Sequence, residues 1–335
     1  MFRKLFVFIL VSLTLSAQAY VDESSCTDMD IRDYHPGLRK HFSTPRNQGS
    51  IGWCYAFAAA DLLSVEAGKP VSSFHVASIY NSSTYSNSIY NYIRSNVEKA
   101  DINDIYESGW LARAVKKVVE RKTICSELIV PFNAEKRETN EFINALHELS
   151  IEAHEQKLNL REVLNELLRI LPQEFENKLN LRAAARSLKY ENINIAVEKI
   201  VSQTCANKSL KVPALATNIV TYYTHGRSRY YSVLNSALNE GRPVALRYNS
   251  GIYTKNKSNG SHISVLSARR WKNGRCQYKI RNSWGKGCSS YKQGIDCIQS
   301  EGAFWINASD LTDNKNTFYY LSGKDKFSSP YKLKY

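Results

Sequence analysis

The chain has 335 residues, of which 43% are hydrophobic and 23% charged, which is the composition of a folded soluble protein with enough length for a sizeable core. Its formal net charge of +14 favours adsorption to acidic surfaces such as envelope polymers or anionic lipid. The lysines and arginines are spread along the chain, so we expect no nucleic-acid module.

Residues 1–19 have the pattern of a secretory signal peptide: two basic residues, an apolar run over 5–15 and the small-x-small site Ala17-Gln18-Ala19. The apolar run is too short to span a bilayer, and no later stretch is apolar enough to do so. We therefore expect cleavage after Ala19, export to the periplasm or the medium, and no stable membrane insertion.

The next segments favour helices. Residues 20–47 are polar and irregular, and an alanine-rich helix is then expected from Cys54 to about Glu66, ended by Gly68 and the proline that follows it. Two further helices are expected, one starting after Ser72 or Ser73 and one carrying apolar residues at helical spacing over 111–119. Residues 20–133 thus form a helical N-terminal part.

Residues 134–204 carry three apolar stripes at helical spacing, are rich in charge and are almost free of glycine. They predict a helical insertion, which is either a cap packed on the main body or a small subdomain.

In the last part of the chain, 205–323, the apolar residues recur with a period of two instead of the helical period. Apolar residues alternate with polar ones near 244–248, 263–265, 278–280 and 304–306, separated by glycine-containing turns. This pattern predicts antiparallel strands, and the chain as a whole is expected to be an α+β protein, helical first and β-rich last. Residues 324–335 are predicted to be a poorly ordered basic tail.

Seven cysteines in an exported chain suggest one reactive thiol and three disulfides. If Cys54 is the free thiol, Cys288 and Cys297, which bracket a short loop, are the pair we favour. The sequence leaves open how the other four pair: Cys26, Cys125, Cys205 and Cys276. There is no CxxC and no histidine at ligand spacing from a cysteine pair, so we expect neither a metal site nor a cofactor.

Three residues in a fixed order point to thiol chemistry. Cys54 lies in the first turn of a helix, where unpaired N–H groups and the helix dipole favour a thiolate. His262, at the head of a strand, is the candidate acid and base. Asn282 could hold the other imidazole nitrogen and so fix the tautomer without adding charge.

Two more residues complete the arrangement. Gln48 could donate to a developing oxyanion together with the backbone N–H of Cys54, and one such donor is worth ~3 kcal/mol of barrier. Trp284 could shield the bond between histidine and asparagine from water. Each residue alone is a weak signal, since a cysteine beside aromatic residues is more often packing than a nucleophile. Together and in this order they predict acyl transfer to a thiol.

The segment 46–57 resembles the active-site segment of papain-like cysteine peptidases, and 282–285 (Asn-Ser-Trp-Gly) is similar to the segment that carries that family's asparagine and tryptophan. The resemblance implies these roles: Cys54 as nucleophile, His262 as acid and base, Asn282 as the orienting residue and Gln48 as oxyanion donor. It also implies a helical left domain, a β-rich right domain, a cleft between them and a peptide or protein substrate. Gly109 resembles the family's glycine on the cleft wall.

The chain departs from the family pattern in several places. His262 follows Cys54 by 208 positions, against roughly 130–150 in the papain type, and the helical insertion accounts for about this excess. Trp53 replaces a residue that is usually small, so we expect it to narrow the cleft. The insertion could restrain access to the site.

The leading hypothesis is an exported cysteine peptidase, with an endopeptidase as the default. One alternative is a binding or regulatory protein that keeps the fold with a blocked cleft. Another is a thiol amidase or a transglutaminase-like enzyme, although the glutamine and the Asn-Ser-Trp-Gly segment fit peptidases better.

Overall fold

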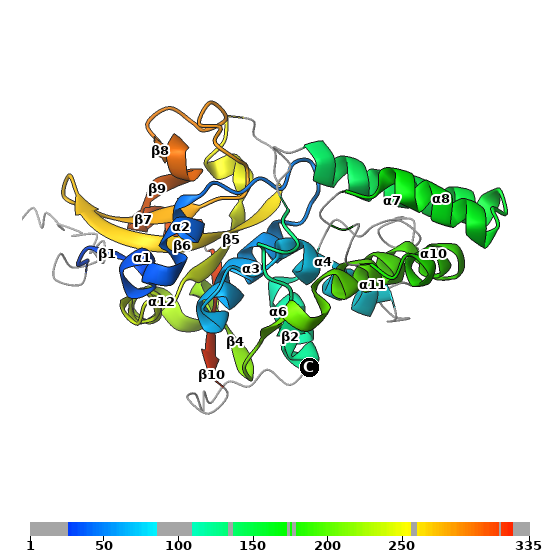
Figure 1. The fold of residues 1–335 in the computed structure, drawn as a ribbon. Coiled ribbons are helices and arrows are strands. Elements are labelled where there is room, and N and C mark those ends of the chain that lie inside the picture. Colours follow the sequence, from blue (N-terminus) through cyan, green and yellow to red (C-terminus); the bar gives the residue numbers. More distant parts are fainter. Residues whose placement is uncertain are drawn as a thin grey trace, which may run out of the picture.

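Helices gather in one half of the molecule and an antiparallel sheet forms most of the other half (Figure 1). The computed structural model describes residues 26–85, 109–132, 137–172, 175, 179–255, 260–314 and 316–323. The α+β expectation is confirmed. The expected signal peptide (1–19) and basic tail (324–335) lie outside the described residues.

The helical half is built around α3, which carries Cys54 as its first residue. Alanines and large apolar residues bury this helix on nearly every side, and Gly68 ends it in the left-handed conformation (φ 64°) that favours glycine. The helices packed around it are α4 (Ser73–Tyr85) and α6 (Leu111–Arg121), while α3 itself spans Cys54–Ala67. These three helices match the sequence prediction closely.

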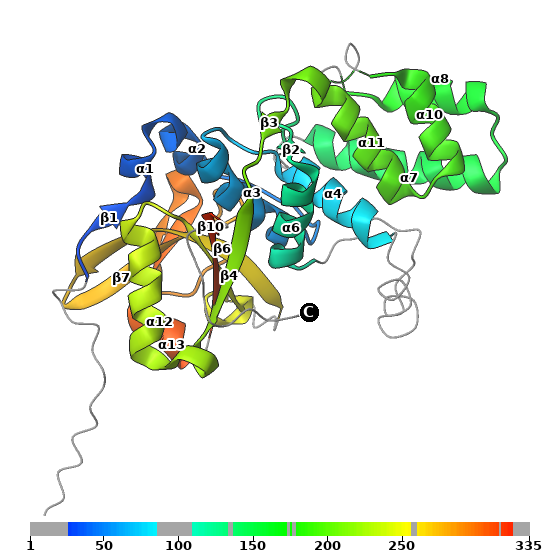
Figure 2. The ribbon, with the colours of Figure 1, turned by 90° about the horizontal axis from the view of Figure 1, so that it is seen from below.

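In its described residues the insertion contains four helices beside this half (green in Figures 1 and 2): α7 (Arg137–Glu155), α8 (Leu160–Ile170), α10 (Leu181–Tyr190) and α11 (Ile193–Cys205). Asn159 starts α8 with a capping box. The helix α11 packs along α4, and the Cys125–Cys205 disulfide fastens its end. The apolar core runs without a break from α3 through α4 into the four helices.

The sheet has the strand order β4-β10-β5-β6-β7-β9-β8, and every neighbouring pair is antiparallel. Its strands are β4 (Leu215–Thr221), β5 (Val244–Asn249), β6 (Ser261–Lys272), β7 (Arg275–Arg281), β8 (Asp296–Ile298), β9 (Ala303–Asn307) and β10 (Thr317–Gly323). Short β1 (Met29–Asp30) adds to β6, and β2 (Thr123–Ile124) pairs with β3 (Leu210–Lys211). The register places His262 opposite Tyr248.

Besides α3, which packs on β6, the helices α12 (Tyr222–Asn239) and α13 (Ala308–Asp313) lie against the sheet (Figure 2). The sequence reading did not predict α12, because Gly226 interrupts it at φ 67° and its tyrosines favour strands. The short helices are α1 (Ile31–Tyr34) and α2 (Arg39–Ser43), with 3₁₀ turns at Pro36–Leu38, Ala206–Lys208, Ser250–Ile252 and Gln299–Glu301. None of the described helices combines the length and apolar character needed to cross a membrane.

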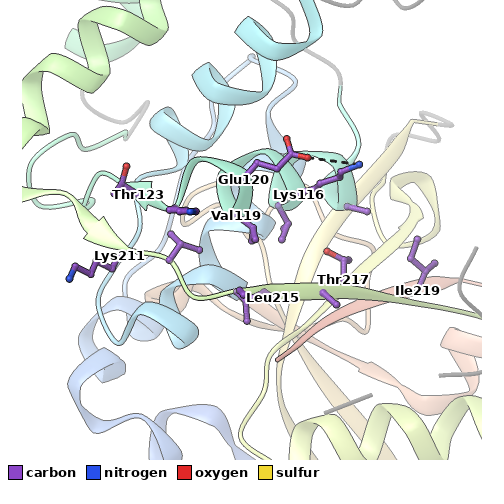
Figure 3. A pocket seen from close by; sticks show the side chains of 14 residues that line it. Lys116, Val119, Glu120, Thr123, Lys211, Leu215, Thr217 and Ile219 are labelled. Carbon is purple, nitrogen blue, oxygen red and sulfur yellow. Dashed lines mark ion pairs between the residues drawn. The ribbon is translucent and has the colours of Figure 1, made fainter. Parts of the chain in front are cut away.

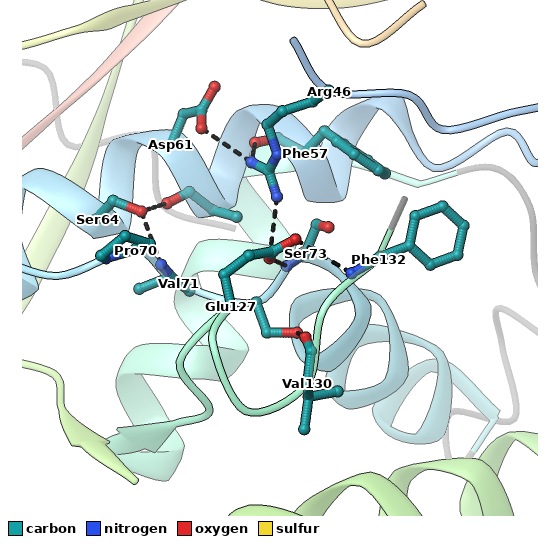
Figure 4. A network of polar contacts seen from close by, with 12 residues as sticks. Arg46, Phe57, Asp61, Ser64, Pro70, Val71, Ser73, Glu127, Val130 and Phe132 are labelled. Atoms are coloured by element: carbon teal, nitrogen blue, oxygen red, sulfur yellow. Dashed lines mark hydrogen bonds and ion pairs between the residues drawn. The ribbon is translucent and has the colours of Figure 1, made fainter. Parts of the chain in front are cut away.

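A buried ion cluster joins the two halves. Asp61 on α3 accepts hydrogen bonds from Arg46 (2.9 Å), from Arg281 at the end of β7 (2.9 Å) and from the ring of His41 (2.8 Å). Arg46 reaches on to Glu127 (3.2 Å), so its guanidinium lies between two carboxylates (Figure 4). Because Asp61 and Arg281 come from different halves, this cluster fixes the nucleophile helix against the strand that precedes Asn282.

Candidate active site

Cys54 is the one described cysteine outside a disulfide, and it opens α3. Burial raises the pKa of its thiol, and the backbone N–H groups of Ile263, Tyr55 and Cys54 itself offset part of that rise. The contact with Ile263 matters most for the site, because Ile263 directly follows His262 and α3 packs on β6. The packing of helix on strand therefore brings the thiol beside the head of β6.

His262 and Asn282 form a hydrogen bond of 2.8 Å between Nε2 and Oδ1. The same Oδ1 accepts the backbone N–H of Ser283 at 2.8 Å. A backbone N–H can only donate, so the amide atom facing it must be the oxygen, and the imidazole nitrogen that also faces this oxygen must carry a proton. The neutral imidazole is thus held as the Nε2–H tautomer, and Nδ1 keeps its lone pair.

Two further side chains hold the same amide, and the sequence analysis missed both. Ser264, two residues after the histidine on β6, donates its hydroxyl to Asn282 Oδ1 at 3.0 Å, and Tyr248 lies 3.1 Å from Ser264 Oγ. Asn282 Nδ2 donates to the hydroxyl of Tyr291 at 2.8 Å. The two-residue period of β6 could have pointed to Ser264, whereas nothing local marks Tyr291.

The histidine ring lies among aromatic side chains. Trp284 covers it at a centroid distance of 4.4 Å, and Tyr248 meets it edge-on at 5.5 Å. Burial lowers the pKa of His262 to about 4, and the bond to Asn282 offsets only part of this effect. With the thiol pKa raised and the imidazole pKa lowered, the resting pair at neutral pH is a neutral thiol and a neutral imidazole.

This charge state leads to a pH prediction. His262 can take the proton of the thiol only as neutral imidazole, and it is neutral above its pKa. We expect kcat/KM on a peptide substrate to rise with pH through an acid limb near pH 4. The measurement is a pH–rate profile at constant ionic strength. An acid limb at the ordinary histidine value of 6.5 would contradict the buried, neutral resting state.

Gln48 is fixed at both ends of its amide. Its Oε1 accepts from Ser283 Oγ at 2.6 Å, and its Nε2 donates to the carbonyl of Ile51 at 2.8 Å. Backbone bonds strengthen this link, since Gln48 N–H donates to the Ser283 carbonyl and Asn47 bridges to Trp284. Gln48 and Asn282 are therefore joined through Ser283, and the second hydrogen on Gln48 Nε2 is the one that an oxyanion could use.

Trp53 lies elsewhere than we expected. Its ring is 1% exposed and packs inside the helical half against Phe74 and Phe132, at 5.8 and 5.6 Å. The prediction that this side chain narrows the cleft is therefore wrong, because the ring fills the core behind α3.

Gly109 packs directly on the ring of Tyr55, the residue after the nucleophile. A Cβ at this position would lie 2.6 Å from that ring, so only glycine permits the approach. The hydroxyl of Tyr55 in turn donates to Asn81 at 3.0 Å. The position of Gly109 thus supports the first turn of α3.

The expected pair Cys288–Cys297 is bonded in the structure, and the four cysteines left open pair as Cys26–Cys276 and Cys125–Cys205. In the part of the chain that the structure describes, His75 lies with Cys125 and Cys205 at ligand spacing. Both sulfurs are used in their disulfide, and His75 Nδ1 accepts the Cys125 N–H. This cluster therefore has no thiolate to offer a metal.

A groove of about 940 Å³ lies between α6 and β4, away from these residues (Figure 3). Its walls are mostly apolar, with Val119, Leu215 and Ile219 among them, and Lys116 and Lys211 stand at its rim. None of Cys54, His262, Asn282 and Gln48 lines it.

No family model and no curated protein matches the chain. Its fold is similar to papain-like cysteine proteases among solved structures. These include the bromelain protease of Ananas comosus in complex with the E64 inhibitor (13% identity, 89% of this chain, 99% of that chain, TM-score 0.44) and procathepsin B S9 of Trypanosoma congolense (14% identity, 89% of this chain, 79% of that chain, TM-score 0.44). The chain is also similar to the solved structure of SERA5E from Plasmodium falciparum (8% identity, 88% of this chain, 96% of that chain, TM-score 0.47). The likeness is one of fold alone.

Proposed function

We propose that the protein is an exported thiol peptidase that hydrolyses peptide bonds through an acyl-enzyme on Cys54. His262 serves as acid and base, Asn282 orients it, and Gln48 contributes to the oxyanion site. Export is supported by the signal-like sequence at 1–19 and by three disulfides, which form in oxidising compartments.

The observation that carries this proposal is the tautomer of His262. The Ser283 N–H fixes the orientation of the Asn282 amide, and that amide fixes the proton on Nε2. The lone pair on Nδ1 is then free to act as the base, and the Cys54 thiol lies against the backbone N–H of Ile263, the residue after this histidine. A histidine held only for packing has no need of an oriented amide whose oxygen accepts three donors.

The reaction follows from these positions. The proton of Cys54 Sγ moves to His262 Nδ1 while sulfur attacks the substrate carbonyl carbon, and the oxyanion forms near the Cys54 N–H and Gln48 Nε2. The proton on Nδ1 then passes to the leaving amine as the C–N bond breaks, which leaves a thioester. A water gives its proton to Nδ1 as its oxygen attacks the thioester carbon. The C–S bond then breaks, the acid leaves, and the proton on Nδ1 returns to sulfur to restore the neutral thiol and imidazole.

Labelling with an epoxysuccinyl thiol inhibitor tests the proposal. We expect one adduct, mapped to Cys54 by intact mass and peptide analysis, because the six other cysteines are held in disulfides. The Cys54→Ser variant should take no label. It should also fail to cleave an unstructured substrate protein at internal peptide bonds, which the wild type is expected to do. Hydrolysis of cell-wall fragments without peptide cleavage would favour the thiol amidase instead.

A binding or regulatory role is the second candidate, and one observation favours it. His262 is buried and Cys54 is half-buried, and burial moves the pKa of Cys54 up and that of His262 down, which disfavours the charged thiolate and imidazolium. An inert, folded wild-type protein in the labelling experiment would support this role and reject the peptidase.

A further inference from the structure

We propose that Tyr291 is a positioning residue for the Asn282–His262 pair, and that the loop closed by Cys288–Cys297 holds it in place. The inference rests on the proposed function for its consequence in catalysis. The contact itself is a feature of the chain: the tyrosine hydroxyl accepts the Asn282 Nδ2 hydrogen at 2.8 Å.

The bond lies in a dry part of the structure, since Asn282 is 2% and Tyr291 5% exposed. The oxygen of the Asn282 amide already accepts from His262, Ser264 and the Ser283 N–H. The tyrosine hydroxyl therefore accepts from the NH₂ group, the other end of the same amide. A buried NH₂ without an acceptor is costly, so Tyr291 favours the one amide rotamer in which Oδ1 faces the histidine.

The loop fixes the tyrosine from several sides. Its backbone pairs with the turn after β5, through Lys255 N–H to the Ser290 carbonyl and Lys292 N–H to the Tyr253 carbonyl, both at 2.9 Å. The Tyr291 ring packs on Phe304 at 4.5 Å.

The disulfide closes the loop behind this ring. Cys297 lies on β8 opposite Phe304 of β9, so the covalent bond ties the loop to the sheet that carries the packing partner. Burial also raises the pKa of Tyr291 to about 12, so the hydroxyl stays neutral and able to accept over the working pH range. The tyrosine thus reaches Asn282 through an anchored loop.

Tyr291 acts on the amide of Asn282, so its removal should change the orientation of the histidine. We expect Tyr291→Phe to lower kcat about tenfold with KM little changed, since loss of a supporting hydrogen bond behind an active-site ligand typically costs this much. Removing the disulfide with the double substitution Cys288→Ser and Cys297→Ser should also lower kcat, as Tyr291→Phe does.

The test combines kinetics with a direct measurement of the tautomer of the His262 imidazole. In protein labelled with ¹⁵N-histidine, the nitrogen shifts of His262 report its tautomer, and we expect Tyr291→Phe to lower the Nε2–H population. The matched control is Tyr278→Phe. Tyr278 is buried in the same half and donates to Asn235 at 2.7 Å, so it should lose stability in the same way while keeping the kcat and the tautomer of the wild type.

The outcomes separate the two proposals. Wild-type protein without Cys54-dependent turnover rejects the peptidase, and the nitrogen shifts of His262 still decide whether Tyr291 orients the pair. Active wild type with unchanged kcat and unchanged tautomer in Tyr291→Phe rejects the positioning role. Equal losses in Tyr291→Phe and Tyr278→Phe would show a general packing effect and also reject it.

Discussion

Replacing His262 with alanine should lower kcat/KM on a peptide substrate by roughly 10³-fold, because one side chain supplies both the base for the thiol and the acid for the leaving amine. The loss should fall on kcat, since the ring is buried between Trp284 and Tyr248. Steady-state kinetics with a fluorogenic peptide measure this change, and alkylation of Cys54 should slow in parallel.

The control is the same substitution at His154, an exposed histidine on α7. His154→Ala should retain wild-type kinetics. Added imidazole should restore part of the activity of His262→Ala by entering the space that the ring leaves. If His262→Ala keeps most of its kcat, another group moves the proton and the tautomer argument does not describe the reaction.

Replacing Asp61 with asparagine should lower the free energy of unfolding by about 3–5 kcal/mol, the cost of breaking a buried ion pair by removing one partner. Burial alone would raise the pKa of Asp61, but Arg281, Arg46 and His41 more than offset it and hold the carboxyl well below its usual range. The variant would leave Arg281, 3% exposed, without its carboxylate. Urea unfolding followed by circular dichroism measures the loss.

The exposed pair of Asp33 and Arg39, 3.1 Å apart, supplies the matched control. Asp33→Asn makes the same chemical change at the surface, where such pairs contribute little, so its unfolding midpoint should stay near that of the wild type. Activity should fall in Asp61→Asn as well, because Arg281 directly precedes Asn282. Equal midpoints for the two variants would mean that the cluster does not hold the halves together.

The sequence predicted the residues whose role depends on local context. Cys54 was placed at a helix start by the alanines after it, and His262 at a strand start by the alternation that follows it. The α+β order and most helix bounds came from the same periodicities. The helix α12 was missed because Gly226 breaks its pattern, which left the segment with the β-rich part of the chain.

The features that the sequence did not predict depend on contacts between segments far apart in the chain. Asp61 and Arg281 are 220 positions apart, and no local pattern pairs them. Trp53 was assigned to the cleft because it precedes the nucleophile, but the direction of a side chain at a helix start depends on the core behind it, here Phe74 and Phe132. Tyr291 reaches Asn282 only through the way its loop folds back.

The unbroken core between α3 and the four helices of the insertion has a consequence for cooperativity. Phe142 and Leu146 of α7 belong to the same apolar cluster as Phe57 and Leu63 of α3. Truncating the chain after residue 133 or after residue 204 would divide that cluster and would also remove Cys205, the disulfide partner of Cys125. The insertion and the nucleophile helix therefore form one folding unit, and a local loss of stability among the four helices also weakens the support of Cys54.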